Sequence, residues 1–377
     1  MSAVGCQLSV ERESREPAAD SPFSCIFRTL LHIEENRPLA PLTTIGIGGP
    51  ARYFAKATTV DAIRDGMAWA SARSLPLFIL GGGSNLLISD DGYKGLVLQL
   101  DLRGLVVESE DEFATVKVAA SEPWDSFVAT AVAHGWAGIE CLSGIPGSTG
   151  ATPIQNVGAY GQDVSETITR VEVLDRKSGV VSTLTNRECR FGYRSSVFKN
   201  DERDRYVVLN VTFRLKAGGP ASVRYPELRR YLEERGQSDQ DLRTVRDAVI
   251  AIRKRKGMVL DPSDPDTRSD GSFFMNPIVD ATEFARFKQK AEGAPSFPSN
   301  DGTVKLSAAW LIEHAGFMKG FTHGKVGLST KHTLAVVNRG VGTAREVREL
   351  VKMVQDRVRE NFGVEIHPEP NFIGFDY

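Results

Sequence analysis

The chain has 377 residues, of which 41% are hydrophobic and 25% charged, and its 46 Lys and Arg nearly balance its 48 Asp and Glu. This length predicts two or three domains. The small net charge of −2 gives no global attraction to nucleic acid or to an anionic membrane, so we expect neither partner. No run reaches the roughly 18 apolar residues of a membrane span, and no basic segment with an apolar core opens the chain. We therefore expect a cytoplasmic protein without membrane insertion.

The four cysteines are widely scattered, which argues against a disulfide framework and against a zinc site. We expect them to be reduced and predict no metal site. Residues 1–23 mix polar residues without periodicity, which predicts a flexible tail, and residues 24–35 could form a short helix. A helix is predicted over 58–72 with Thr59 as its cap, and the apolar run LPLFIL at 75–80 predicts a strand.

A first glycine-rich segment, GGGSNLL at 81–87, directly follows that strand. Glycines leave backbone N–H groups uncovered, and such a turn can bind a diphosphate. The segment differs from the dinucleotide fingerprint GxGxxG, because an apolar stretch and a turn at 90–92 follow where a helix should begin. A Rossmann fold is therefore disfavoured, and the absence of GxxxxGK[ST] excludes a P-loop hydrolase.

A second and longer glycine-rich segment, GIPGSTGATPIQNVGAYG, covers 144–161. Strands are expected before it at 96–102 and 115–120, with a helix at 124–134. Either glycine segment alone is as readily explained by tight turns as by a ligand. Two of them together favour a large phosphate-bearing cofactor.

The second half of the chain continues an α+β pattern. A hairpin with a Ser178-Gly179 turn is predicted within 168–184, and RYVVLNVTFRL at 205–215 predicts another strand. The glycine-rich stretch after Lys216 is a candidate domain boundary. An amphipathic helix is expected at 241–256. A long helix is expected to begin at a Thr343/Glu346 capping box and to stop at Gly363, and NFIGF is expected to form the last strand.

Three further motifs contain residue types suited to chemistry. In FGYRSSVFK at 191–199, strand alternation would place Tyr193 and Arg194 on opposite faces. In DGSFFMNP at 270–277, the same alternation would place Ser272, Phe274 and Asn276 on one face. In HPEPNF at 367–372, two prolines flank Glu369 and offer no donors to compete for its carboxylate.

Each of these residues also has an ordinary structural interpretation. Arg194 could be a surface ion-pair residue, Ser272 a turn residue after Gly271, and Glu369 an exposed residue leading into the last strand. Taken singly, these structural interpretations are favoured, and the pattern alone does not bring the three residues together in space.

A resemblance to a known family emerges when the motifs are taken together. The set IGIGGPARYF, GGGSNLL, GIPGSTGATPIQNVGAYG, ECRFGYRSSVFK, DPSDPDTRSDGSFFMNP, KLSAAWLIEHAG, KVGLSTKHTLAVVN and HPEPNFIG resembles the UDP-N-acetylenolpyruvoylglucosamine reductases, the MurB family of peptidoglycan synthesis. The resemblance extends from about Leu39 to Phe375 and leaves the N-terminal tail outside.

The resemblance implies an α+β fold with a two-lobed FAD-binding module of the vanillyl-alcohol oxidase (PCMH) type and a C-terminal α+β substrate-binding domain. We therefore expect a tail over 1–30, the FAD-binding module over 31–220 with its lobes divided near 103, and the substrate-binding domain over 221–377. The last strand could return to the FAD-binding module.

The family's functional positions are matched one motif at a time. Arg194, Ser272 and Glu369 match the catalytic positions. Tyr193, Tyr225, Lys256 and Asn276 match substrate-binding positions, whereas His332 matches one only loosely and is better interpreted as a solvated loop residue. The FAD-binding positions implied by the resemblance are Gly81, Gly82, Gly83, Ser84, Asn85, Gly147, Ser148, Gly150, Gln155, Asn156 and Gly158.

The implied reaction uses NADPH as co-substrate and FAD as the hydride carrier to reduce the enolpyruvyl group of a UDP-sugar. Arg194 would stabilise the developing enolate, with Glu369 beside it, and Ser272 would donate the proton. The FAD is expected to be non-covalent, because no histidine lies between His32 and His134. We expect a monomer or weak oligomer.

Two alternatives remain at this point. One is another non-covalent FAD oxidoreductase of the same superfamily, acting on a different substrate. The other is a UDP-sugar-binding regulator without redox activity, which would be expected to have lost one of Arg194, Ser272 or Glu369, although all three are present.

Overall fold

The structure is a computed structural model that describes residues 31–237, 241–299 and 301–375. The predicted tail over 1–30 lies outside the described residues. The short helix predicted at 24–35 is wrong where it can be examined, because Glu34–Pro38 form strand β1. This strand pairs antiparallel with β2 (Pro50–Ala57), so pairing at a sheet edge prevails over the local helix tendency of its glutamates.

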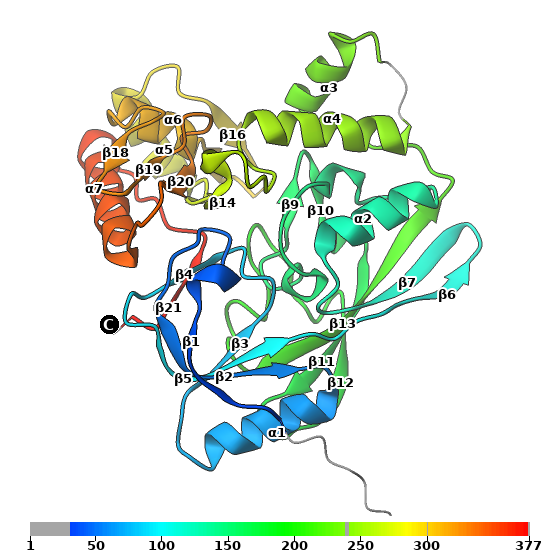
Figure 1. The fold of residues 1–377 in the computed structure, drawn as a ribbon. Helices are drawn as coiled ribbons and strands as arrows, with labels where there is room; N and C mark the ends of the chain where they lie inside the picture. The colour runs from blue at the N-terminus through cyan, green and yellow to red at the C-terminus, as the bar shows by residue number, and fades with distance from the viewer. Residues whose placement is uncertain (1–30, 238–240, 300, 376–377) are drawn as a thin grey trace, which may run out of the picture. The chain divides into compact units, whose positions relative to one another are not determined.

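The first sheet has the strand order β1-β2-β5-β3, with β5 at Tyr93–Leu100 and β3 at Leu77–Leu80 (Figure 1). The pairs β2·β5 and β3·β5 are parallel, and helix α1 (Val60–Ser71) makes the connection from β2 to β3 that parallel pairing requires. Thr59 caps α1 as predicted, accepting a hydrogen bond from the Ala62 N–H. The edge strand β3, which ends at Leu80, thus leads directly into the first glycine segment.

The second sheet is antiparallel throughout and has the order β12-β11-β13-β7-β6. Its core cluster packs helix α2 (Trp124–Ala133) against the sheet through Trp124, Phe127 and Phe213. The predicted hairpin is confirmed, since Gly179 N–H donates to the Asp175 carbonyl at the turn. The strands are β6 (Leu105–Glu110), β7 (Phe113–Ala119), β11 (Ile168–Asp175), β12 (Val181–Thr185), β13 (Tyr206–Ala217), and the short β8 (Trp136–Ala137), which pairs with the end of β13.

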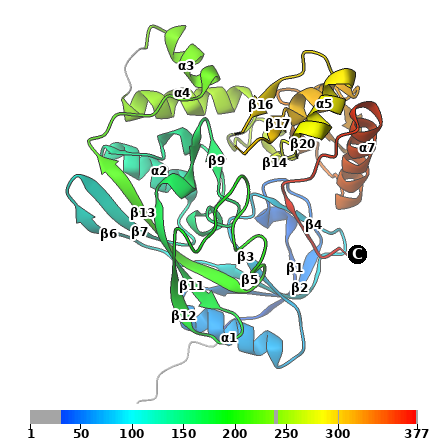
Figure 2. The same ribbon diagram turned by 180° about the vertical axis from the view of Figure 1, so that it is seen from behind.

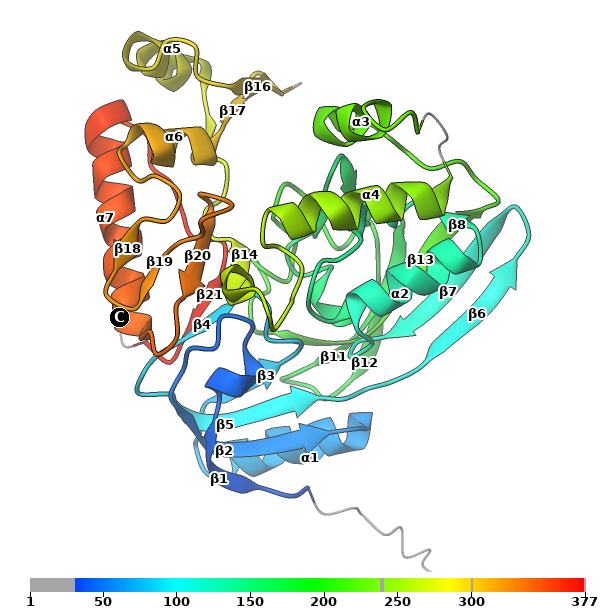
Figure 3. The same ribbon diagram turned by 45° about the horizontal axis from the view of Figure 1, so that its top comes forward.

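Helices α3 (Pro226–Glu233) and α4 (Leu242–Arg255) pack on the same side as α2 (Figures 1 and 3). Their buried residues share a cluster with Ala137 and Cys141 from the first half of the chain. The apolar face predicted for 241–256 is the buried face of α4, and Asp241 caps its first turn. Between these layers lie the two-residue strands β9 (Gly158–Ala159) and β10 (Gln162–Asp163).

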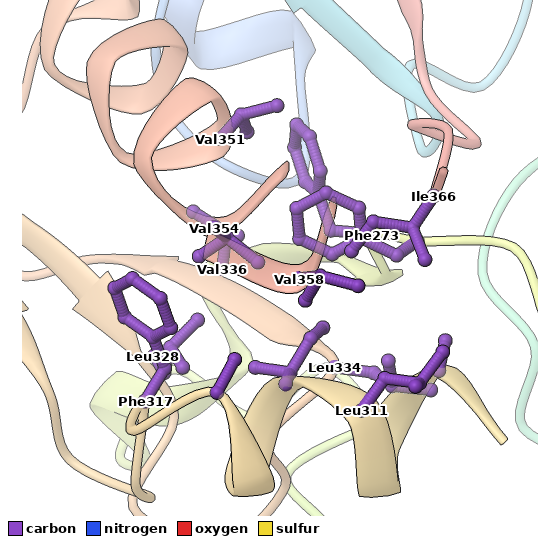
Figure 4. Close-up of a cluster of buried hydrophobic side chains, with 14 of the residues drawn as sticks. Phe273, Leu311, Phe317, Leu328, Leu334, Val336, Val351, Val354, Val358 and Ile366 are labelled. Carbon is purple, nitrogen blue, oxygen red and sulfur yellow. The ribbon is translucent and has the colours of Figure 1, made fainter. Parts of the chain in front are cut away.

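In the described residues, the C-terminal part contains a further sheet with the order β14-β20-β19-β18, a small sheet β15-β17-β16, and the helices α5, α6 and α7. Helix α7 begins in the predicted Thr343/Glu346 capping box and ends at Gly363, whose φ of 69° is left-handed. In Figure 4, Val354 and Val358 of α7 face Leu311 and Leu334 in the cluster that holds this part together. The elements are β14 (Ser269–Ser272), β15 (Ile278–Val279), α5 (Ala281–Lys290), β16 (Ser296–Pro298), β17 (Val304–Leu306), α6 (Ala308–His314), β18 (Thr322–His323), β19 (Val326–Leu328), β20 (Ala335–Asn338) and α7 (Ala344–Phe362).

The last strand, β21 (Asn371–Ile373), pairs in parallel with β4 (Leu86–Ile88), the strand that directly follows the first glycine segment (Figure 2). Ile45, Ile47 and Leu87 join the same core cluster as the C-terminal helices. The C-terminal end of the described chain is therefore packed against residues 45–47 and 86–88, next to the glycine turn. Within the described residues, no helix combines the length and apolar character of a membrane span.

Two residues of α7 allow the contribution of the C-terminal core to be measured. Leu350 is 1% exposed in that core and Met353 is 41% exposed on the outer face of the same helix. Leu350→Ala should lower the free energy of unfolding by about 2–5 kcal/mol, because it removes buried methyl groups and leaves a cavity. Met353→Ala should change it by less than about 0.5 kcal/mol. Equal effects of the two variants in chemical denaturation would contradict the packing described here.

Candidate active site

A cavity of about 1240 Å³ is lined by both glycine segments and by Arg194, Ser272 and Glu369. Its volume exceeds the roughly 300–1,000 Å³ of sites for drug-sized ligands, so it has room for a large cofactor and a further ligand. All the site residues predicted from the sequence line it, with the exception of Asn156. The fold therefore collects residues from both halves of the chain around one space.

The two glycine segments touch one another. A Cβ added at Gly82 would lie 2.7 Å from Cα of Gly147, and a Cβ added at Gly147 would lie 2.4 Å from Oγ of Ser84. The Ser84 hydroxyl donates to the Pro146 carbonyl at 3.2 Å. Gly82 is required because the facing backbone is closer than a side chain allows, and the φ of 111° at Gly147 favours glycine as well.

The second glycine segment is fixed by backbone hydrogen bonds to the end of β7 and the start of α2. Gly150 N–H donates to the Ala120 carbonyl at 2.8 Å, and Trp124 N–H donates to the Gly147 carbonyl at 3.0 Å. A Cβ added at Gly150 would lie 2.5 Å from Cβ of Ala120, which explains why glycine occupies this position. The segment is thus held by regular structure along one side.

A chain of polar contacts links both glycine segments to the C-terminal motif. Asn85 Nδ2 donates to Gln155 Oε1 at 2.8 Å, and Gln155 Nε2 donates to Glu369 Oε1 at 3.0 Å. The same Glu369 oxygen lies 3.3 Å from Nε of Arg194. The side chains of Glu369 and Arg194 are 14% and 18% exposed, so the pair is largely shielded from water.

Arg194 lies in a tight turn, and the strand alternation expected for this motif is wrong. Gly192 and Ser195 are joined across the turn, and the φ of Arg194 is 51°, a left-handed value that a strand residue does not adopt. Its guanidinium donates to the Gly158 and Asn156 carbonyls at 2.5 and 3.3 Å. These contacts fix the turn, and both Tyr193 and Arg194 line the cavity as a result.

Asn156 was expected to contact the cofactor, but its side chain has a structural role. It is 4% exposed, donates through Nδ2 to the Gly192 carbonyl at 3.0 Å, and accepts from Ser165 N–H at 3.1 Å. With these partners it is turned into the protein and does not line the cavity. Asn156 instead supports the turn that presents Arg194.

Ser272 and Glu369 are brought together by pairing between their segments. Phe274 and Pro368 form a bridge, and Glu369 N–H donates to the Phe273 carbonyl at 2.8 Å. Strand β14 ends at Ser272, so its alternation stops there. The prediction that Phe274 shares a face with Ser272 and Asn276 is therefore wrong: Phe274 is buried in the C-terminal core, whereas the other two line the cavity.

The four predicted substrate-binding residues also line the cavity. Tyr193 lies near Asn276, and Nζ of Lys305 stands 4.9 Å from the Tyr193 ring centroid. The ring of Tyr225 meets that of Tyr160 edge-on at 5.5 Å. Lys256, at the end of α4, pairs with Glu227 at 2.6 Å.

His332 lines the cavity as well, so its interpretation as a solvated loop residue is wrong. Burial, together with the positive charges of Lys256 and Lys319, lowers the pKa of His332 to about 4. The imidazole is neutral at pH 7 and can donate or accept a hydrogen bond there.

Several cavity residues were missed by sequence reasoning. Three of them have a buried polar atom without a hydrogen-bond partner in the described part of the protein, namely Nζ of Lys199, Nε of Arg253 and Oδ2 of Asp270. Such atoms are costly in a folded protein unless a ligand satisfies them. The sequence offered one signal for two of these residues, namely a charged side chain at the end of a motif already singled out. Lys199 ends FGYRSSVFK, and Asp270 begins DGSFFMNP.

Asp270 adjoins the first glycine segment. Its Oδ1 accepts from the Thr44 hydroxyl at 3.0 Å, and the Leu86 backbone also donates to the carboxyl group. Burial raises the pKa of Asp270 to about 7 despite these two donors. Among the residues that could be examined, no group of three or more His, Cys, Asp or Glu side chains is arranged to bind a metal ion.

Comparison with known proteins identifies two matching domains. Residues 51–185 match the family of FAD binding domains, and residues 261–373 match the C-terminal domain of UDP-N-acetylenolpyruvoylglucosamine reductase. The predicted α+β fold with an FAD-binding module is thereby confirmed.

Whole-chain relatives carry the same name. The chain is 50% identical over 351 residues to UDP-N-acetylenolpyruvoylglucosamine reductase of Thermobifida fusca (strain YX), covering 90% of this chain and 97% of that protein. It is 48% identical over 350 residues to the protein of that name from Salinispora arenicola (strain CNS-205), covering 90% and 95%. The crystal structure of UDP-N-acetylenolpyruvylglucosamine reductase (MurB) from Thermus caldophilus aligns with a TM-score of 0.62 at 25% identity, covering 91% of this chain and 98% of that one.

The contact between the glycine segments can be tested with two neighbouring substitutions. Gly82→Ala should destabilise the protein by on the order of 1–3 kcal/mol, because its Cβ would meet backbone atoms of Gly147 and Ser148 at 2.7–2.8 Å. Gly81→Ala should cost less, since its Cβ would meet only the rotatable Ser148 hydroxyl at 3.0 Å. Thermal unfolding without added ligand measures both, and an equal or greater loss for Gly81→Ala would refute the close approach.

The buried carboxyl of Asp270 predicts a pH-dependent stability. Because its folded pKa is raised from 3.8 to about 7, the folded state binds a proton that the unfolded state releases, and stability falls as pH rises between these values. Above pH 7 the loss reaches at most about 4 kcal/mol. Asp270→Asn, which keeps the acceptor for Thr44, should therefore raise the unfolding temperature at pH 8 and have little effect at pH 4. A benefit independent of pH would contradict this account.

Proposed function

The chain belongs to the UDP-N-acetylenolpyruvoylglucosamine reductase family, and from that premise we propose the reaction that its cavity performs. The protein uses NADPH and FAD to reduce the enolpyruvyl group of UDP-N-acetylglucosamine enolpyruvate, giving UDP-N-acetylmuramate for peptidoglycan synthesis. The observation that carries this proposal is the contact chain Asn85–Gln155–Glu369–Arg194, because it joins the cofactor loops to the reacting groups.

The residues present fit FAD. A large cofactor with a diphosphate needs uncovered backbone, and the two glycine segments offer it because a Cβ does not fit at their contact. It can also supply partners for the three buried polar atoms that have none among the described residues. Bound FAD supplies the hydride carrier between NADPH and the sugar. The residues proposed to hold it are Gly81, Gly82, Gly83, Ser84, Asn85, Gly147, Ser148, Gly150, Gln155 and Gly158. We propose that the FAD is non-covalent, since the sequence has no histidine between His32 and His134, where the first glycine segment lies.

Arg194 is proposed to stabilise the negative charge that develops on the enolpyruvyl carboxylate and its neighbouring carbon. Its guanidinium is fixed by two carbonyls and by Glu369, so it need not reorganise during the reaction. Glu369 orients this cation and takes a hydrogen bond from Gln155. A preoriented charge in a shielded site is more effective than the same charge in water.

Ser272 is proposed to donate the proton that completes the reduction. Its segment is paired with that of Glu369, and Ser272 lines the same cavity as Arg194 and Glu369, which supports this role. An alcohol is a weak acid, but a carbon with enolate character is basic enough to take its proton. Neither a metal ion nor a histidine is needed for this step.

The UDP-sugar is proposed to contact Tyr193, Tyr225, Lys256 and Asn276. Lys256 supplies a cation for the diphosphate, and the Tyr160–Tyr225 pair provides aromatic surface nearby. We propose the domain division accordingly, with 31–220 holding FAD in two lobes that divide near 103, and 221–377 contributing most substrate contacts and returning β21 to the first part.

We further propose that the protein acts in the cytoplasm, where NADPH and UDP-sugars are available. One chain supplies every proposed site residue, which agrees with a monomer or weak oligomer.

The proposed function is tested by turnover. Purified protein with FAD should oxidise NADPH only when the enolpyruvyl UDP-sugar is present, and mass spectrometry should find a product heavier than the substrate by two hydrogen atoms. NADPH oxidation that does not depend on this sugar, or that leaves it unchanged, would count against the proposal.

Ser272→Ala separates the two halves of the reaction. The variant keeps the glycine segments and Arg194, so NADPH should still bleach the flavin at close to the native rate in anaerobic stopped flow. Reoxidation by the enolpyruvyl sugar should slow by on the order of 10²–10⁴-fold, because the proton donor is missing.

The matched control is Ser182→Ala, on an exposed position of β12, which should leave both rates unchanged. If Ser272→Ala slows flavin reduction and spares reoxidation, the serine positions the cofactor and is not the proton donor.

A further inference from the structure

Lys199 lines the cavity where the charges of Arg194 and Glu369 act on it, and we call this part of the cavity the reacting end. Its Nζ is shielded from solvent and has no hydrogen-bond partner among the described residues, although an ammonium group can donate three hydrogen bonds. Burial lowers the pKa of Lys199, while the charge of Glu369 raises it and that of Arg194 lowers it. A group of this kind is expensive to bury unless a negative charge compensates it in the working state.

Arg194, whose charge acts on Lys199, is already engaged by protein groups. Arg194 donates to two carbonyls and pairs with Glu369, whereas Lys199 forms no ion pair within 4.0 Å in the described structure. Of these two cations, Arg194 is committed to protein groups, whereas the hydrogen-bond donors of Lys199 are unused among the described residues.

The position of Lys199 is fixed by the FAD-binding module. Its neighbour Phe198 is buried in the core cluster of the second sheet, and the Ser196 hydroxyl donates to the Ile154 carbonyl of the second glycine segment. Lys199 N–H donates to the Ser196 carbonyl at 3.2 Å. The ammonium group is thus attached to the walls proposed to hold the cofactor, and its nitrogen is shielded from solvent.

We propose that Lys199 is an electrostatic positioning residue that stabilises the negative charge gained by bound FAD when NADPH reduces it. This inference rests on the proposed function. When NADPH delivers a hydride, a C–H bond of its nicotinamide breaks with both electrons, NADP⁺ remains, and one unit of negative charge enters the cavity. A fixed ammonium in a shielded site stabilises that added charge more than water would.

The test is the midpoint potential of the bound flavin, measured by dye equilibration without the sugar substrate. Lys199→Met keeps a side chain of similar length and removes the charge. Its potential should be more negative by at least about 30 mV, which corresponds to a tenfold change in the equilibrium of a two-electron couple. Lys199→Arg should restore the potential, and Lys352→Met, on an exposed lysine of α7, should not change it.

Two further readouts separate this role from the alternatives. Removal of an uncompensated buried charge should not lower the unfolding temperature of the FAD-free protein, and Lys199→Gln repeats the measurement if the methionine variant fails to fold. An unchanged potential overturns the inference, and an unchanged potential with weakened binding of the enolpyruvyl sugar assigns Lys199 to the substrate instead. If the native protein binds no FAD, the proposed function itself fails.

Discussion

The amide side chain of Gln155 is the contact on which the site depends. Through its oxygen it accepts from Asn85 of the first glycine segment, and through its nitrogen it donates to Glu369, 214 residues further along the chain. An amide can accept at one end and donate at the other, so it joins an amide donor to a carboxylate without leaving either unpaired. Arg194 completes the set from a third segment, and the proposed catalytic groups are therefore oriented by the same contacts that hold the two glycine segments together.

This arrangement requires the backbones to come unusually close. Gly82 and Gly147 approach to a distance at which no Cβ fits, and β21 returns from the end of the chain to pair with β4 directly after the first glycine segment. Because loops in contact with one another move less independently, the expected diphosphate site and the expected hydride-accepting end are held in a fixed relation. The buried ammonium of Lys199 and the buried carboxyl of Asp270, each with an atom that lacks a partner in the described residues, raise the cost of forming this space without a ligand.

Features set by local sequence were predicted well. Thr59 and the Thr343/Glu346 box mark helix starts because a cap needs only a few neighbouring residues, and the buried face of α4 follows from its own periodicity. The left-handed turn at Arg194 was mistaken for a strand, since it is imposed by carbonyls of the second glycine segment. The inward turn of Asn156 and the burial of Phe274 depend on long-range contacts in the same way. For the grouping of Arg194, Ser272 and Glu369, the family resemblance supplied what periodicity could not. Lys199 and Asp270 stand in the same motifs, but only the fold shows that their polar atoms are buried without partners among the described residues.

The visible absorption spectrum of the purified protein tests the central claim most directly. If the two glycine segments and the buried polar groups enclose FAD, the protein should show a flavin spectrum, or acquire one when FAD is added, and denaturation should release unmodified FAD into solution. A folded protein that is colourless and does not bind added FAD would contradict the account, whatever the positions of its catalytic side chains.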